Sequence, residues 1–191
     1  MKHTKTIASI VTIAAILGAL AGCSTDEARI EAIAERQARK LLDEYKQSFK
    51  PEKFGFGVPW EKDFSYAQGV KAGNLIFVAG QLSHRQTKDE TWGYDTVTVG
   101  EDFETQFRQT LENIKAVLGH YGATMDDVVF LQNFFDPEAD GNKIGNYGPT
   151  VRKLINEYFP NAQHAMTNMQ ITDLFGRNQF VETNAIAVVR E

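Results

Sequence analysis

The single cysteine of the chain is the residue with the most definite chemistry. Cys23 follows Leu20, Ala21 and Gly22, a pattern at which a bacterial leader is cleaved and the new N-terminal thiol is acylated. The preceding residues 1–22 fit such a leader, because they begin with lysines and continue with an apolar run too short to cross a bilayer as a mature helix. Several acyl chains on one residue give stable membrane anchoring. We therefore expect a bacterial cell-envelope protein anchored to the membrane through lipidated Cys23.

The residue that follows Cys23 indicates which membrane of the envelope the protein would reach. Ser24 is not acidic, and in this respect the sequence resembles lipoproteins sorted to the outer membrane, where the protein would face the periplasm. The lone cysteine excludes an intrachain disulfide and a cysteine metal cluster. The histidines lack metal-ligand spacing and no nucleotide or flavin motif is present, so we expect no metal and no cofactor.

Four basic side chains are candidates to hold an anionic ligand. Arg85 falls in a polar loop and Arg177 in a turn, where solvated arginines are usual. Arg152 falls on a predicted helix and would contribute only if it faces a cleft. His164 could serve as a polar handle, although a surface histidine after a helix is the simpler interpretation.

Length and charge restrict the class of protein. Without residues 1–22, 169 of the 191 residues remain, which suits one domain with a sizeable core. Loss of Lys2 and Lys5 with the leader moves the formal net charge from −5 to −7. An acidic domain without a basic stripe argues against nucleic acid and against electrostatic docking to anionic lipid.

Two segments separate the anchor from the domain. Residues 23–50 form the anchored tether, in which 26–50 are predicted to be helical, because they lack Gly and Pro and are rich in helix formers. Such a helix would span roughly 35–40 Å. It could be a free tether, a helix packed on its own domain or a short coiled coil. Residues 51–63 form a hinge rich in Gly and aromatic residues, which we expect to cover apolar surface of the domain at 64–191.

The domain predicts an α+β fold with one mixed sheet and two helices on one face. The other sheet face then needs cover, which a second subunit would supply most simply. The second helix is expected to carry Pro149 in its first turn. The expected strands are residues 65–73, 75–81, 94–99, 128–135, 166–174 and 180–189, and the expected helices are residues 102–118 and 149–159.

Five segments in order resemble one family. They include Tyr-Ala-Gln-Gly at 66–69 leading to Phe-Val-Ala-Gly-Gln at 77–81, then Tyr-Phe-Pro at 158–160 and Ala-Ile-Ala-Val at 185–188, with residues 100–114 and 122–129 between them. These segments are similar to the Rid (YjgF) family of reactive-intermediate imine and enamine deaminases. The resemblance implies a chorismate-mutase-like fold, a homotrimer and small-molecule clefts between subunits.

The resemblance also implies a chemistry that this sequence does not fully support. Hydrolysis of a 2-imino acid needs an Arg to clamp the carboxylate and an acid to hold the water. At the family positions of these residues the chain has Met166 and Asn184. A thioether cannot pair with a carboxylate, and an amide can orient water but cannot take its proton. The helix position where the family usually has an Asn holds Arg152.

The remaining site residues follow from the same alignment. The residues expected to bind ligand are Tyr66, Gly80, Met166, Asn168 and Asn184. The catalytic candidates are Asn184, His164, which adjoins the lost Arg, and Arg152. Glu182 is expected to face away from the cleft, because side chains alternate along a strand.

Three functions remain open. The first is an envelope-tethered trimer that binds a small apolar or weakly polar molecule and does not act as a classical 2-imino acid deaminase, since such substrates arise in the cytosol. The second is a hydrolase of the imine or enamine deaminase type that acts on a different substrate. The third is a trimeric interaction module whose clefts have lost their use.

Overall fold

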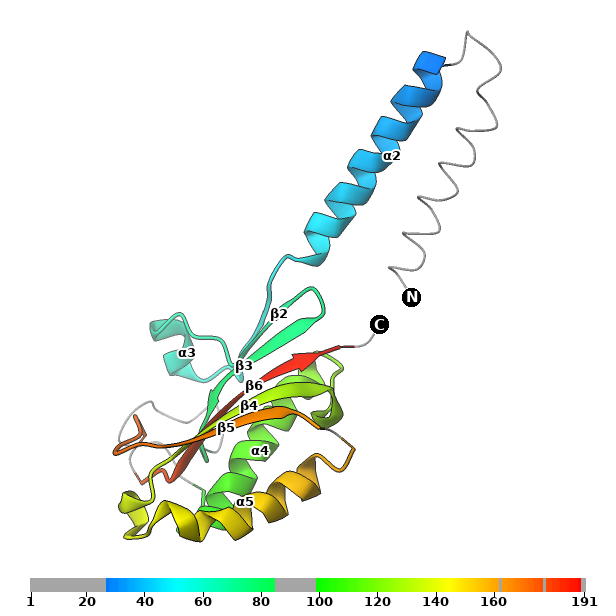
Figure 1. Cartoon of the computed structure of the whole chain (residues 1–191). Helices are drawn as coiled ribbons and strands as arrows, with labels where there is room; N and C mark the ends of the chain where they lie inside the picture. Colours follow the sequence, from blue (N-terminus) through cyan, green and yellow to red (C-terminus); the bar gives the residue numbers. More distant parts are fainter. Residues whose placement is uncertain (1–26, 85–98, 162, 177, 190–191) are drawn as a thin grey trace. The chain divides into compact units, whose positions relative to one another are not determined.

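The computed structural model describes residues 27–84, 99–161, 163–176 and 178–189 (Figure 1). The chain divides into two compact units, of which the second comprises residues 51–190. The expected leader, Cys23, Arg85, Arg177 and all but the last residue of the strand expected at 94–99 lie outside the described residues.

The first unit contains one described helix, α2, which runs from Glu27 to Ser48 and confirms the expected helix. Charged side chains cover much of it, and Arg39 pairs with Glu35 one turn away at 2.6 Å. Several of its large apolar side chains are about half exposed, among them Ile33 and Leu42. No helix in the described part of the chain is long and apolar enough to span a membrane.

The second unit is built on one six-stranded mixed sheet (Figure 1). The strand order is β1-β2-β3-β6-β4-β5, and all neighbours are antiparallel except β4 and β5. The strands are β1 (Glu52–Phe54), β2 (Gly69–Ala72), β3 (Leu75–Gln81), β4 (Val128–Phe135), β5 (Ala165–Gln170) and β6 (Val181–Val188).

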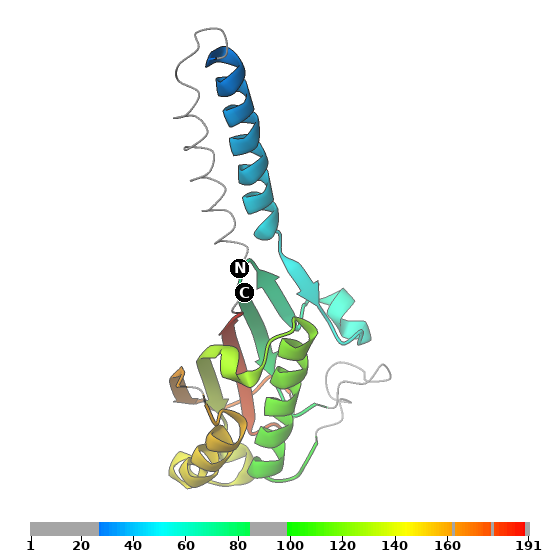
Figure 2. The same cartoon turned by 90° about the vertical axis from the view of Figure 1, so that its right-hand side faces the viewer.

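Two helices, α4 (Phe103–His120) and α5 (Ile144–Tyr158), cover the same face of this sheet, as Figure 2 shows. Asp102 caps α4 by accepting a hydrogen bond from the Thr105 amide at 2.9 Å. The core lies between helices and sheet, and its fully buried members include Phe107, Leu111, Ile114, Leu131 and Leu154. The expected α+β architecture with two helices on one face is therefore confirmed.

The start of α5 corrects one prediction. The helix begins at Ile144, so Pro149 lies inside it and not in its first turn. The apolar positions Tyr147, Val151 and Leu154 continue one buried face through the proline. The Tyr147 ring stacks on Phe103 with centroids 3.6 Å apart, and this packing outweighs the hydrogen bond that the proline cannot donate.

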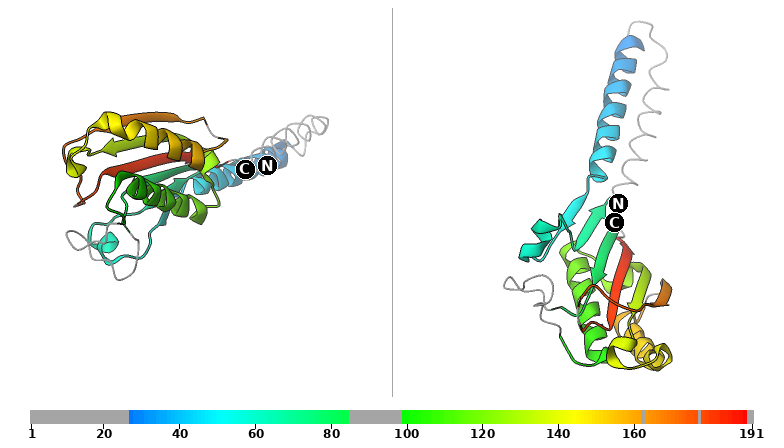
Figure 3. Two further views of the ribbon diagram at one scale, coloured as in Figure 1. Left: turned by 90° about the horizontal axis from the view of Figure 1, so that it is seen from below. Right: turned by 90° about the vertical axis from the view of Figure 1, so that its left-hand side faces the viewer.

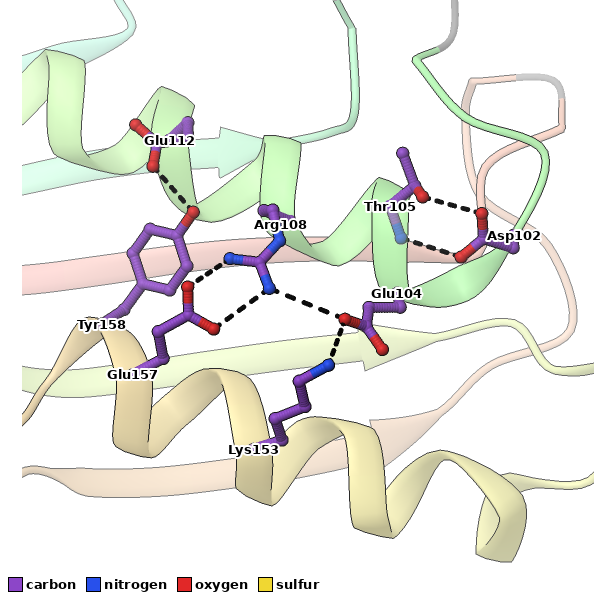
Figure 4. Close-up of polar contacts among 8 residues, drawn as sticks. All are labelled: Asp102, Glu104, Thr105, Arg108, Glu112, Lys153, Glu157 and Tyr158. Atoms are coloured by element: carbon purple, nitrogen blue, oxygen red, sulfur yellow. Dashed lines mark hydrogen bonds and ion pairs between the residues drawn. The ribbon is translucent and has the colours of Figure 1, made fainter.

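A polar network joins α4 to α5 on their exposed sides (Figure 4). Arg108 makes two hydrogen bonds to the Glu157 carboxylate, and Lys153 pairs with Glu104. One turn further, Tyr158 donates to Glu112 at 2.7 Å. Exposed pairs contribute little to stability individually, but this network fixes the spacing between the helices.

The hinge segment packs on the domain, as its aromatic residues predict. Strand β1 joins the sheet edge, and the short helix α3 (Pro59–Asp63) follows it. Trp60 is buried, and the Phe54 ring stacks on His120 with centroids 4.0 Å apart. The Tyr121 hydroxyl donates to the carbonyls of Gly69 and Glu52, so the end of α4 holds both edge strands.

The sheet face opposite α4 and α5 is exposed in part within the described residues of one chain (Figure 3, right). It carries Leu75, Phe77 and Val129, whose side chains are 38%, 44% and 44% exposed. Phe77 lies beside Ile186 of β6 in the strand register. An apolar face of this kind indicates a protein–protein contact.

Candidate functional site

One cavity lies between α5 and strands β4 and β5 and has a volume of about 370 Å³. Register places Met166 opposite Leu131 and Asn168 opposite Asn133, so both β5 side chains lie on the helix-covered face. The walls are mainly apolar. The lining residues are Phe135, Ile144, Tyr147, Gly148, Val151, Arg152, Ile155, Asn156, Met166 and Asn168.

A chain of hydrogen bonds fixes the amide of Asn168. Its Oδ1 accepts from Asn133 Nδ2 at 2.8 Å, and Thr183 Oγ1 donates to Asn133 Oδ1 at 2.7 Å. Asn133 and Thr183 are fully buried. Asn168 therefore offers its remaining amide hydrogens to the cavity in a defined orientation.

Arg152 lines the same cavity as Met166. It is exposed on α5, and none of the ion pairs among the described residues involves it. Arg152 was expected to contribute to a binding site only if it faces a cleft, and it does line this cavity. It brings a guanidinium group to the rim of an otherwise mainly apolar space.

His164 lies just before β5 and is not among the described residues that line the cavity beside Met166. Its ring packs against Phe159 with centroids 4.6 Å apart, and burial lowers the pKa of its imidazole. Within the described part of the chain, its enclosed Nδ1 has no hydrogen-bond partner. The single chain does not bring His164 into contact with the other candidates.

Asn184 projects from the opposite face of the sheet. On β6 the buried side chains of Thr183 and Ala185 face the helices, so Asn184 faces away from them. Its Nδ2 donates to Gln132 Oε1 of β4 at 3.3 Å. Met166 and Asn184 therefore cannot share one site within a single chain.

A second cavity, of about 310 Å³, contains the other two expected ligand contacts, Tyr66 and Gly80. Glu182 lines it as well, which corrects the expectation that this side chain faces away. Residues 182 and 184 are two apart and therefore share one face of β6. A Cβ atom on Gly80 would lie 1.8 Å from Glu182 Oε1, so the glycine leaves the space in which the carboxyl group lies.

Aromatic and apolar side chains form the walls of this second cavity. Trp60 and Tyr66 are tilted against each other with ring centroids 5.1 Å apart, and the Tyr66 hydroxyl donates to the Gly80 carbonyl at 3.3 Å. Sequence reasoning missed His84 and misplaced Glu182. The remaining lining residues are Phe64, Gln68, Leu82 and Phe175.

Burial sets the protonation of the groups in the second cavity. It raises the pKa of Tyr66 to about 12, with smaller contributions from the negative charges of Glu182 and Glu61. It lowers the pKa of His84 to about 4 and raises the pKa of Glu182 above its usual range. At neutral pH the phenol is protonated and the imidazole is neutral, so among the described lining residues Glu182 is the ionisable group that can carry charge.

Metal chemistry finds no support in the described residues, which contain no group of three or more His, Cys, Asp or Glu side chains placed to hold an ion. Cys23, Arg85 and Arg177 belong to parts of the chain that the structure does not describe.

Known proteins with similar sequences belong to one family. The profile of the family described as Endoribonuclease L-PSP matches residues 61–189. A RutC family protein of Pyrococcus abyssi is 30% identical over 122 residues, which cover 64% of this chain and 84% of that protein. The 3-aminoacrylate deaminase RutC of Acinetobacter baylyi is 31% identical over 106 residues, 56% of this chain and 73% of that protein.

Solved structures agree on the architecture. A Mycobacterium tuberculosis member of the YjgF/YER057c/UK114 family matches with a TM-score of 0.58 and 24% identity over 73% of this chain and 100% of its own. RidA from an Antarctic Psychrobacter species matches with a TM-score of 0.56 and 22% identity over 72% of this chain and 98% of its own. At these identities the likeness establishes the fold.

Proposed function

Because the chain belongs to the Endoribonuclease L-PSP (YjgF/Rid) family, we propose that it is an envelope-tethered member that binds a small molecule and is not a classical 2-imino acid deaminase. The observation that carries this proposal is the position of Met166. Its side chain lines the cavity between α5 and β5 at the point where the family resemblance calls for an Arg. A thioether gives soft apolar contact there and no clamp for a carboxylate.

The cavity lining defines the ligand. Tyr147 and Val151 are buried beneath it and Met166 is 40% exposed at its side, so the walls favour an apolar body. Asn168, oriented through Asn133, suits a carbonyl or hydroxyl group at one end of the ligand. We therefore propose a small neutral or weakly polar molecule as the occupant.

Location and assembly belong to the same proposal. The lipobox pattern at Cys23 supports anchoring, with the outer membrane facing the periplasm as the location. The partly exposed apolar sheet face supports association of copies, which we propose to be a trimer. Ligand clefts between subunits would then combine the Met166 side of one copy with the Asn184 face of another.

One observation favours a second candidate, a hydrolase for a different imine or enamine. Arg152 lies on the same cavity as Met166 and could bind a substrate carboxylate from the helix side. Relatives of the chain that are named deaminases agree with this alternative. It requires that Arg152, and not Met166, governs recognition.

The two candidates differ in the ligand they prefer. Saturation-transfer NMR on the full chain in nonionic detergent can compare 2-pentanone with 2-oxobutanoate, which are similar in size but neutral and anionic respectively. The binding proposal predicts that 2-pentanone binds and that Met166→Trp, which fills the cavity, abolishes its signal. Preferential binding of 2-oxobutanoate that is lost in Arg152→Gln but kept in Arg36→Gln, an exposed arginine on α2, would overturn it in favour of the hydrolase.

A further inference from the structure

Helix α2 carries an apolar stripe with a regular period. Successive members of the stripe are four, four, three, four and four residues apart, so the pattern repeats after 11 residues. Such a repeat corresponds to about 3.67 residues per turn and keeps the stripe on one side of the helix. Although α2 ends at Ser48, the rings of Tyr45 and Phe49 lie with their centroids 4.9 Å apart, which continues the stripe beyond it. The stripe comprises Ile30, Ala34, Ala38, Leu41, Tyr45 and Phe49.

We propose that this stripe is an interface through which the α2 helices of three copies pack in parallel as a stalk. The proposal rests on the association of copies that forms part of the proposed function, and it adds a second contact to that assembly. In a trimer with threefold symmetry, helices that meet on the axis run in the same direction. The 11-residue repeat favours a right-handed supercoil, in contrast to the left-handed coil that a seven-residue repeat produces.

The width of the apolar band favours three helices over two. Ile33 and Leu42 lie on opposite borders of the stripe, because successive residues are about 100° apart around a helix. Both side chains are about half exposed, as are Tyr45 and Phe49 within the stripe. A two-stranded coil buries only a narrow seam, whereas a helix with two neighbours buries a wider band. Since most helical stability comes from packing of an apolar face, burial of this band would stabilise α2 itself.

Charges beside the stripe suit a second copy of the same helix. Glu31 and Lys46 lie along one border, and the other border carries charges of the opposite order. There Arg29 lies near the start of the helix and Glu44 near its end. In a parallel bundle each border faces the other border of the next copy, so an acid lies near the level of a base at both ends. The five acidic and five basic residues of α2 cancel, which gives the helix no net attraction to anionic lipid.

The length of α2 defines how much the stalk can do. A helix of 22 residues is short for a bundle that assembles on its own. Copies joined through their domains would hold the helices at an effective concentration on the order of mM, which favours their packing. The domain contact therefore keeps the copies together, and the stalk adds to it.

Disulfide cross-linking of the full chain in nonionic detergent tests the proposal. Ala34→Cys places a thiol in the stripe, and Ala32→Cys places one on the opposite side of α2. A disulfide needs Cα atoms less than about 7 Å apart, which the stalk provides at position 34 only. We expect a linked dimer to form about tenfold faster from Ala34→Cys than from Ala32→Cys. The natural chain, with Cys23 as its only cysteine, gives the background rate.

A charge exchange separates contacts between copies from contacts within one helix. Within its own helix, Glu31→Lys gains Glu27 and Glu35 as partners one turn away. In the stalk the same lysine would lie near Arg29 of the next copy. We expect Glu31→Lys to slow the cross-linking of Ala34→Cys about threefold, and the further change Arg29→Glu to restore the rate.

Two results would overturn the stalk. One is an equal rate for Ala34→Cys and Ala32→Cys in a chain that sediments as a trimer, which would leave the domain contact standing. The other is a rate that Glu31→Lys leaves unchanged or raises, as its partners within one helix would predict. A natural chain that sediments as a monomer would overturn the proposed assembly together with the stalk.

Discussion

Gly80 and Glu182 form a complementary pair across two neighbouring strands, in which the missing side chain of one accommodates the carboxyl group of the other. The carboxyl group consequently lines the cavity that contains Tyr66. It lies two positions before Asn184 on the same face of β6, so this face of the strand carries an acid next to the position where the family resemblance implies one.

Gly80→Ala tests this relationship. The added methyl group must push the Glu182 carboxyl group out of its place, and we expect a loss of about 1–2 kcal/mol in the free energy of unfolding. In a Glu182→Ala background the same substitution meets no carboxyl group and should cost less. Urea unfolding of the four proteins gives the coupling, for which we expect about 1 kcal/mol. An equal cost of Gly80→Ala in both backgrounds would show that the two residues do not compete for space.

His84 should make the protein sensitive to acid. Its pKa falls from 6.5 to about 4 because the imidazole is buried, so the folded state favours the neutral form. This stabilisation is fully present above pH 6.5 and is lost as the pH falls towards 4, and the shift corresponds to roughly 3 kcal/mol at most. Stability measured between pH 7 and 4 should therefore fall less steeply for His84→Gln than for the natural chain. Parallel pH profiles would refute this contribution of His84.

The sequence predicted those elements in which local signals and packing agree. Strand β4 has the expected bounds, and α4 begins after Asp102, whose side chain caps it. Helix α5 was placed too short, because Pro149 suggests a first turn, whereas the stacking of Tyr147 on Phe103 extends the helix by more than one turn. Strand β1 depends on pairing with β2 and has no signal in its own three residues.

The candidate site was predicted in part, for a similar reason. Side chains alternate along a strand, and on this basis Glu182 was expected to face away from the cleft. Residues 182 and 184 are two apart, however, so both lie on the same face of β6. The space above Gly80 that admits the carboxyl group is a tertiary feature of two strands. His84 gave no signal in the sequence because the burial that lowers its pKa is a tertiary feature. In contrast, Met166 and Arg152 could be named as candidate site residues from the sequence. The sequence did not predict that they line the same cavity.

Tyr121 should matter more for stability than the visible ion pairs. Its hydroxyl donates to the Gly69 and Glu52 carbonyls at 2.8 and 3.1 Å, and Tyr121→Phe would remove both hydrogen bonds at a cost of about 1–2 kcal/mol. Arg108→Met, which breaks the exposed network of Figure 4, should cost less, and the loss should shrink in high salt. Denaturant unfolding at low and high salt compares the two. A larger loss for Arg108→Met would contradict this ranking.

The partly exposed sheet face should be an interface between copies. Phe77 is 44% exposed there beside Ile186, so Phe77→Asp would place a charge into the contact and shift the protein towards monomer. Sedimentation velocity should report a trimer for the natural chain and a smaller species for the variant. Ile33→Asp on α2 serves as the comparison, because it would dissociate the protein only if a coiled coil holds the copies together. A monomeric natural chain would contradict the proposed assembly.

The central claim, that this family member binds a small molecule without classical deamination, is tested most directly by ammonia release from freshly generated 2-iminopropanoate. The full chain should release ammonia no faster than buffer, since Met166 cannot clamp the substrate carboxylate and Asn184 cannot take a proton from water. Arg152→Gln should then change nothing. Acceleration by the natural chain that disappears in Arg152→Gln, with Arg36→Gln unaffected, would contradict the account and establish a hydrolase that uses the cation on α5.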